Sequence, residues 1–229
     1  MSAALFWKKR ISLVLSGVVS TLLVCVFVVY AYFLTGIKTI TLEKSFYFLV
    51  SKSTHVQASA QEIVQSGGAG YLLLQGERQY VAYSVYLSKT DGLKVQANVS
   101  SLGESVALVE KRAEKLYLKS AAQRANIEKI QGAFNSLYGL LEVLDDEIAR
   151  LSSGGTQESS KTVLEVLKKQ FSFLGAAYKK VFPAFSKVCE KATEDLFVIL
   201  SDVIFARDLR YLQCELCDSY VQLTAAFSL

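Results

Sequence analysis

Cysteine and histidine are the residues of this chain that could support redox or metal chemistry. Cys214 and Cys217 form a C-x-x-C pair, and His55 is the only histidine. Redox pairs of this spacing lie at the start of a helix after a strand, whereas this pair lies inside an apolar helical pattern. A zinc site needs further ligands, and His55 belongs to another part of the chain. We predict buried free cysteines and no metal site, with a redox or disulfide role as the alternative.

Other polar residues form no catalytic arrangement. His55 has no serine, cysteine or carboxylate pattern beside it that would make it a catalytic base. The glycine-rich run 67–70 is not a phosphate loop, because it leads into a strand pattern and no Lys-Ser/Thr follows. Asn98 begins a glycosylation acceptor, but it falls within a predicted helix. We therefore predict a protein that is not an enzyme and has no cofactor.

Charge argues against nucleic acid as a partner. The formal net charge is +4, but residues 1–44 carry five Lys/Arg against one Glu, and residues 120–229 carry twelve against fourteen Asp/Glu. The mild basicity thus comes largely from the N-terminal segment. Proteins that bind nucleic acid carry a basic stripe on one face, and no such stripe is present.

An uncharged run extends from Ile11 to Leu34 and follows Lys8, Lys9 and Arg10. About 20 apolar residues cross a hydrocarbon core of roughly 30 Å, so the run predicts one transmembrane helix over 11–34. The basic residues before it predict a cytoplasmic segment 1–10 and extracytoplasmic domains after the span. A cleavable signal peptide is the alternative, but its apolar region is shorter and ends at a small-x-small site.

Residues 35–45 predict a linker, and residues 46–119 predict a small α/β domain. Aromatic and β-branched runs predict strands at 46–50, 71–74, 80–87 and 106–109, the last with an extension to 116–118. Helical spacing after a Thr54 capping box ends at Gly67, and a second helix begins at Ser88 or Thr90 and ends at Gly103. The order β-α-β-β-α-β predicts an antiparallel four-stranded sheet with both helices on one face.

This order and length resemble the SPOR domain, a peptidoglycan-binding family whose members often carry an N-terminal membrane anchor. The resemblance is carried by residues 47–50, by residues 66–71, and by residues 80–87 followed by 88–91. It implies binding of glycan strands stripped of stem peptides, on the sheet face that the helices leave uncovered. On this resemblance the ligand-binding residues are Tyr47, Leu49, Gln75, Arg78, Val81 and Tyr83. Rings would stack on sugars, although the preference of tyrosine for strands also explains these residues.

Three long helices are predicted for residues 120–229. Apolar residues follow a heptad spacing from Ile127 to Leu151 and again from Leu164 to Val188. Pro183 lies inside the second pattern and predicts either a kink or a new helix, and we favour the kink. The predicted helices are 120–151, 157–191 and 194–227, the first starting at a Ser120 capping box and the second capped by Thr156. The third has a broad apolar face, which either belongs to a self-contained bundle or contacts a partner helix or second copy.

These observations predict the α+β fold class: a transmembrane helix, a SPOR-like βαββαβ ferredoxin-like domain and a three-helix bundle. The leading hypothesis is a single-pass protein of the bacterial cell membrane that binds peptidoglycan glycan strands during division or sporulation. The alternative is a membrane-anchored scaffolding protein that acts only through protein–protein contacts of its helical bundle. The sequence does not distinguish self-association from binding of another protein.

Overall fold

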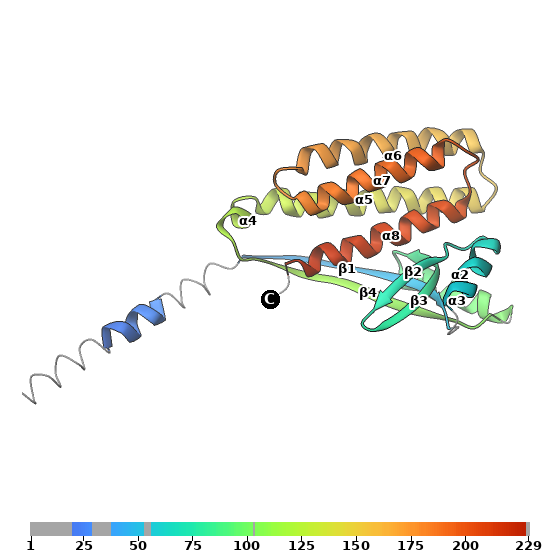
Figure 1. Ribbon diagram of the computed structural model, residues 1–229. Helices are drawn as coiled ribbons and strands as arrows, with labels where there is room; N and C mark the ends of the chain where they lie inside the picture. Colours follow the sequence, from blue (N-terminus) through green and yellow to red (C-terminus); the bar gives the residue numbers. More distant parts are fainter. Residues whose placement is uncertain (1–19, 29–37, 53–55, 103, 228–229) are drawn as a thin grey trace, which may run out of the picture.

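The computed structural model describes residues 20–28, 38–52, 56–102 and 104–227. Within these ranges an antiparallel sheet lies beside a layered group of helices, which makes the fold α+β (Figure 1). The strands are β1 (Lys38–Ser51), β2 (Tyr71–Gln75), β3 (Arg78–Tyr86) and β4 (Val106–Leu118). Their spatial order is β2-β3-β1-β4.

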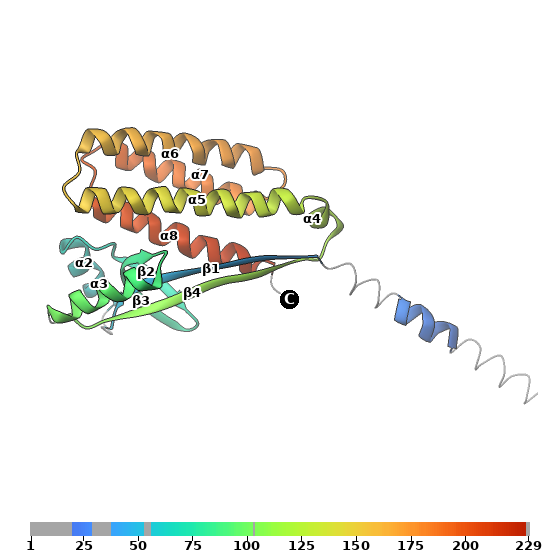
Figure 2. The same ribbon diagram turned by 180° about the vertical axis from the view of Figure 1, so that it is seen from behind.

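The helices between the strands are α2 (Val56–Gln65) and α3 (Lys89–Ser101). The element order is therefore the predicted β-α-β-β-α-β, and the strand order is that of a split βαβ unit. Both helices lie on the same side of the sheet (Figure 2). Gly67 ends α2 with φ of +88°, a conformation that costs glycine little because it has no Cβ.

The outer strands are longer than predicted. β1 begins at Lys38, so residues 38–45 of the predicted linker 35–45 are strand, and residues 35–37 lie outside the described residues. Residues 38–51 pair with residues 106–118 of β4, with a register shift between Thr41 and Lys44. Glu43 adopts φ of +47° at this irregularity. Alternating side chains such as Ile40 and Leu42 are buried, because the helices cover this part of the sheet too.

The C-terminal half contains α4 (Ala121–Ala125), α5 (Ile127–Ser152), α6 (Gln157–Tyr178), α7 (Pro183–Leu200) and α8 (Ala206–Ala225). The Ser120 capping box predicted at its start is present. The prediction of three helices is wrong, because the second and third each break. Pro183 does not kink a continuous helix but lies at the first position of α7, where its missing N–H costs no hydrogen bond.

The second break separates α7 from α8 at residues 201–205, the region where the apolar pattern loses its period. Gln157 of α6 holds this connection, because its Nε2 donates to the Ile204 carbonyl at 2.8 Å and its Oε1 accepts from the Ile204 N–H at 3.0 Å. The four long helices then run alternately up and down, and α8 lies between the others and the sheet (Figure 1).

Helix α8 covers the sheet face opposite α2 and α3. Phe46 of β1 meets Tyr220 of α8 edge to face, with ring centroids 5.2 Å apart, and Tyr220 meets Phe134 of α5 at 5.0 Å. One buried apolar cluster therefore includes residues of the sheet and of the helices. The two segments 46–119 and 120–229 share this core.

The structure contradicts the predicted transmembrane helix over 11–34. Among the helices of the described ranges, none combines the length and the apolar composition that a membrane span requires. Of the predicted span only residues 20–28 are described, as part of a helix. The rest of the span and the segment 1–10 lie outside the described residues. The predictions of a single-pass anchor and of a membrane location are corrected accordingly.

Candidate functional site

The residues predicted to bind glycan do not share an open face of the sheet. A Cβ placed on Gly92 of α3 would lie 3.0 Å from Leu108 Cδ1 and 3.5 Å from Tyr47 Cβ, so Tyr47 lies under α3. Leu49 pairs with Leu108 and is 1% exposed. Both β1 residues are therefore directed at a helix, because only alternate residues of a strand share a face.

The four other predicted residues are divided among different places. Gln75 and Arg78 pair across the β2–β3 turn and are exposed at the hairpin rim. Val81 is buried. Tyr83 contacts the α2–β2 turn, where a Cβ on Gly68 would lie 3.2 Å from its ring. The structure thus brings Gln75 and Arg78 together but not the set of six.

The opposite face of the sheet is closed by α8 through a buried polar cluster. Asp218 of α8 accepts hydrogen bonds from Lys111 Nζ at 2.5 Å and from the Tyr71 hydroxyl at 3.0 Å. Gln222 donates a third at 3.0 Å. Burial raises the pKa of Tyr71, and the Asp218 charge and hydrogen bond raise it further, so the phenol stays protonated and donates. The cluster satisfies charges that would otherwise be buried without partners.

A polar cleft of about 390 Å³ opens beside Tyr83. We call it the Tyr83 cleft, and it is lined by Ser51, Lys52, Ser59, Glu62, Ile63, Ser66, Tyr83, Glu104 and Ser105. The Tyr83 hydroxyl donates to Glu104 Oε2 at 3.2 Å. Burial, followed by the charge of Glu104, raises the pKa of Tyr83 to about 12, so this hydroxyl remains a donor at neutral pH.

A second, apolar groove of about 590 Å³ runs along the bundle between α5 and α6. We define the outer α5–α6 face by Ser136, Gly139 and Val143 of α5 together with Val166, Lys169 and Phe173 of α6. Phe173 is 72% exposed, and Val166 and Val143 are 50% and 41% exposed. A phenylalanine so exposed beside two exposed valines indicates a contact surface, because scattered single residues are the usual exposed hydrophobics.

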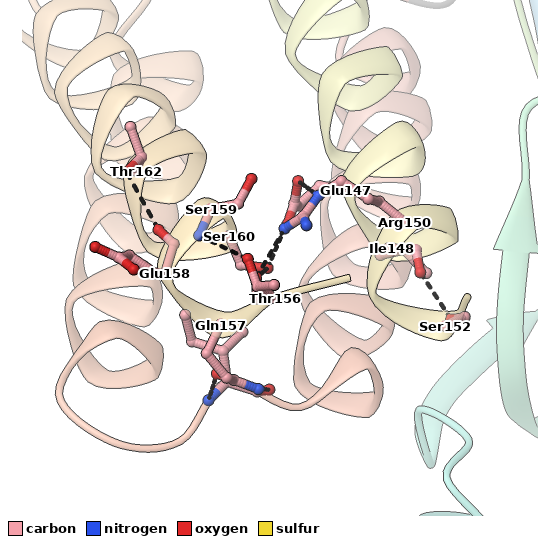
Figure 3. A network of polar contacts seen from close by, with 11 residues as sticks. Glu147, Ile148, Arg150, Ser152, Thr156, Gln157, Glu158, Ser159, Ser160 and Thr162 are labelled. Atoms are coloured by element: carbon pink, nitrogen blue, oxygen red, sulfur yellow. Dashed lines mark hydrogen bonds and ion pairs between the residues drawn. The ribbon is translucent and has the colours of Figure 1, made fainter. Parts of the chain in front are cut away.

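A polar network fixes the α5–α6 turn and with it the walls of this groove (Figure 3). Arg150 contacts both oxygens of the buried Glu147, at 3.0 and 2.5 Å, and also reaches Ser160 of α6. Burial opposes ionisation of Glu147, but the hydrogen bonds from Arg150 and Ser160 outweigh it and hold the pKa of that carboxyl below its usual range. Thr156 caps α6 by accepting from the Ser159 N–H, as the sequence predicted.

Sequence reasoning missed Val166 and Phe173, which lie off the heptad pattern of α6. The signal was present, because two apolar residues seven apart occupy one face of a helix and these are separate from the buried stripe. Gly139 contributes to the groove by having no side chain. A Cβ placed there would meet nothing within 4 Å, so its absence leaves open space in the groove.

Three of the four cysteines are buried as predicted, whereas Cys25 is exposed. Cys189, Cys214 and Cys217 are buried free thiols, and Cys214 and Cys217 lie in the middle of α8. Within the described ranges, no group of three or more His, Cys, Asp or Glu residues could hold a metal ion. His55 lies outside the described residues.

No family model matches this sequence, and neither a curated protein nor a solved structure matches it. The SPOR resemblance therefore stays a prediction. The polar Tyr83 cleft and the apolar outer α5–α6 face are the two candidate sites.

Proposed function

We propose that this chain is a protein-interaction module that binds a helical protein partner on its outer α5–α6 face. The exposed Phe173 carries the proposal, because this large ring lies beside a groove and has no apolar cover within the described part of the chain. Aromatic side chains are enriched in protein interfaces and depleted from free surfaces, since their burial removes much apolar area from water.

The form of the groove favours a helix as the bound element. Its lining repeats along both walls, at Ser136, Gly139 and Val143 on α5 and at Val166 and Phe173 on α6. A helix in a groove contacts its partner through residues spaced three, four and seven apart, which matches such a straight, two-walled surface. The closed α5–α6 turn holds both walls in place, so the binding surface exists before the partner arrives.

Site-specific photo-crosslinking of the full chain tests this proposal. A photoreactive phenylalanine analogue at Val166 is compared with the same analogue at Lys161, which is exposed on another side of α6. We expect a discrete protein adduct from position 166 and little from position 161. Equal adduct formation at the two positions, or none at 166, would contradict the proposal.

A second candidate function rests on the Tyr83 cleft. Its four serine hydroxyls and one phenol both donate and accept, its two carboxylates accept, and Ile63 supplies an apolar patch. Sugars need this mixture, because each hydroxyl forms hydrogen bonds of both kinds and each ring has an apolar face. The cleft volume lies in the range of small-molecule sites. We propose glycan strands of peptidoglycan as its ligand, in keeping with the SPOR resemblance.

Co-sedimentation with isolated sacculi tests the second candidate, before and after amidase removal of stem peptides. We expect the full chain to be retained and the Glu104→Gln and Ser66→Ala variants to be retained less. Glu165→Gln, at an exposed residue of α6 outside the cleft, is the matched control. The absence of retention on either preparation would exclude glycan binding.

A further inference from the structure

We infer that the helices that cover the outer α5–α6 face belong to a second copy of this chain, packed about a twofold axis parallel to α5 and α6. The inference rests on the proposed function, because it names the partner of the same face. Its basis is a match between the two walls of the face in height, shape and charge.

Two contacts fix the height of α6 relative to α5. A Cβ on Gly132 would lie 3.3 Å from the Tyr178 hydroxyl at one end, and Arg150 contacts Ser160 at the other. Counting inward from both contacts along antiparallel helices places Phe173 about level with residue 137 and Lys169 about level with residue 141. The groove lining agrees, because residues 136–143 of α5 lie opposite residues 166–174 of α6. Phe173 thus lies at the height of the gap between Ser136 and Gly139.

A twofold axis parallel to the helices preserves these heights and places α5 of each copy opposite α6 of the other. Phe173 of one copy then faces the small residues Ser136 and Gly139 of the other, a large side chain opposite open space. At its own height, Val166 of one copy faces Val143 of the other. Each contact occurs twice, as a twofold interface requires, and knobs in holes are how helices of a bundle pack side by side.

Charge completes the match at the edges of the face. By helical periodicity, Glu142 lies on the side of α5 turned away from the groove residue Leu140. Lys169 lies beside Phe173 at the rim of the groove, on the side of α6 turned away from Leu174. Both are exposed, and neither belongs to an ion pair found in the described part of the chain. The twofold axis brings Glu142 of one copy beside Lys169 of the other, about one residue's rise apart in height. Pairs at this position set partner choice in helical bundles.

Sedimentation of the purified full chain over a range of concentrations tests the inference. We expect a monomer–dimer equilibrium for the natural sequence. Gly139→Leu fills the space that receives Phe173, while its own fold has room for a Cβ, and we expect it to raise the dissociation constant about tenfold or more. Lys169→Glu places like charges together and weakens the dimer, and Glu142→Lys combined with Lys169→Glu restores it. Lys161→Glu is the matched control and leaves the equilibrium unchanged.

A natural chain that stays monomeric at every concentration overturns the inference, as does a dimer that neither Gly139→Leu nor Lys169→Glu weakens. Failure of the charge swap to restore the dimer overturns the twofold arrangement. These outcomes separate the inference from the proposed function. A monomer that still gives a crosslinked adduct from Val166, of a mass other than twice the chain, retains the interaction face and excludes the second copy.

Discussion

Lys111 of β4 and Asp218 of α8 form an ion pair at 2.5 Å, with 13% and 4% of their side chains exposed. This pair fastens the last helix of the chain to the sheet face opposite α2 and α3 and excludes solvent from it. The Tyr71 hydroxyl and Gln222 fill the other acceptor positions of the carboxylate. The pair therefore determines which surfaces of the molecule remain open.

Removal of Asp218 is expected to destabilise the chain strongly. Asp218→Ala leaves the Lys111 ammonium buried without its partner, and such losses cost about 3 kcal/mol. Urea unfolding followed by circular dichroism measures the change. Lys94→Ala is the control, because the Lys94–Asp91 pair is exposed and its loss costs about 0.5 kcal/mol or less. Similar effects of the two substitutions would contradict the assignment of Asp218 to the sheet–helix contact.

Glu147 predicts a loss of stability in acid. Its pKa is lower in the folded chain than the ordinary 4.5, so the unfolded chain binds the proton more readily. Its contribution is complete above pH 4.5 and disappears as the pH falls through the lower folded value. We expect Glu147→Gln to be less stable than the natural chain at neutral pH and to approach it in acid. A constant difference in unfolding free energy across this range would disprove the role of the charge.

Asp195 predicts a pH dependence of stability opposite in sign to that of Glu147. Its Oδ2 is buried without a hydrogen bond, and burial raises the pKa of the carboxyl, with Lys191 opposing and Glu194 adding to the shift. The ionised form is therefore unfavourable in the fold, and stability falls as the pH rises through the raised value. Asp195→Asn should stabilise the chain at neutral pH by up to about 1 kcal/mol, since solvent screens part of the effect. Thermal unfolding measures the change, with Glu165→Gln, at an exposed carboxylate, as the control. The absence of a gain in stability for Asp195→Asn would refute the interpretation.

The buried thiols should be inert in the folded chain. Burial raises the pKa of Cys189 to about 12 and raises the pKa values of Cys214 and Cys217 as well, so little thiolate forms at neutral pH. Mass spectrometry after alkylation should find these three positions unlabelled in buffer and fully labelled in urea. Rapid labelling of Cys214 or Cys217 in buffer would reopen a redox role for the C-x-x-C pair.

The sequence predicted features that depend on neighbouring residues. The β-α-β-β-α-β order, the glycine end of α2 and the Ser120 and Thr156 caps each follow from a few consecutive side chains, and the structure contains them. The apolar spacing continues past Pro183 and therefore predicts a kink, whereas the structure starts a new helix there. A turn before α7 is favoured over a kinked helix because it lets the chain reverse direction and pack α7 along α6. At the first position of α7 the missing N–H of Pro183 removes no helical hydrogen bond.

The covering of the second sheet face by α8 depends on contacts between distant residues, and the sequence therefore did not predict it. Tyr71 and Asp218 are separated by 147 positions, and no local pattern shows that α8 covers the sheet. The alternation that places Tyr47 and Leu49 on one face was correct, but the identity of the covered face needed the helices as well. Phe173 could have been recognised as an apolar residue outside the heptad pattern, although its exposure follows only from the position of α5.

Hydroxyl-radical footprinting of the full chain at low and high concentration tests most directly whether the outer α5–α6 face is an interface. Phe173 and Phe197 are 72% and 63% exposed in the single chain, and Phe197 lies on α7, which makes it an internal control. We predict that oxidation of Phe173 falls with concentration while oxidation of Phe197 does not change. An interface at this face would be contradicted if oxidation of Phe173, relative to Phe197, stays the same at every concentration and does not fall when a helical partner is supplied.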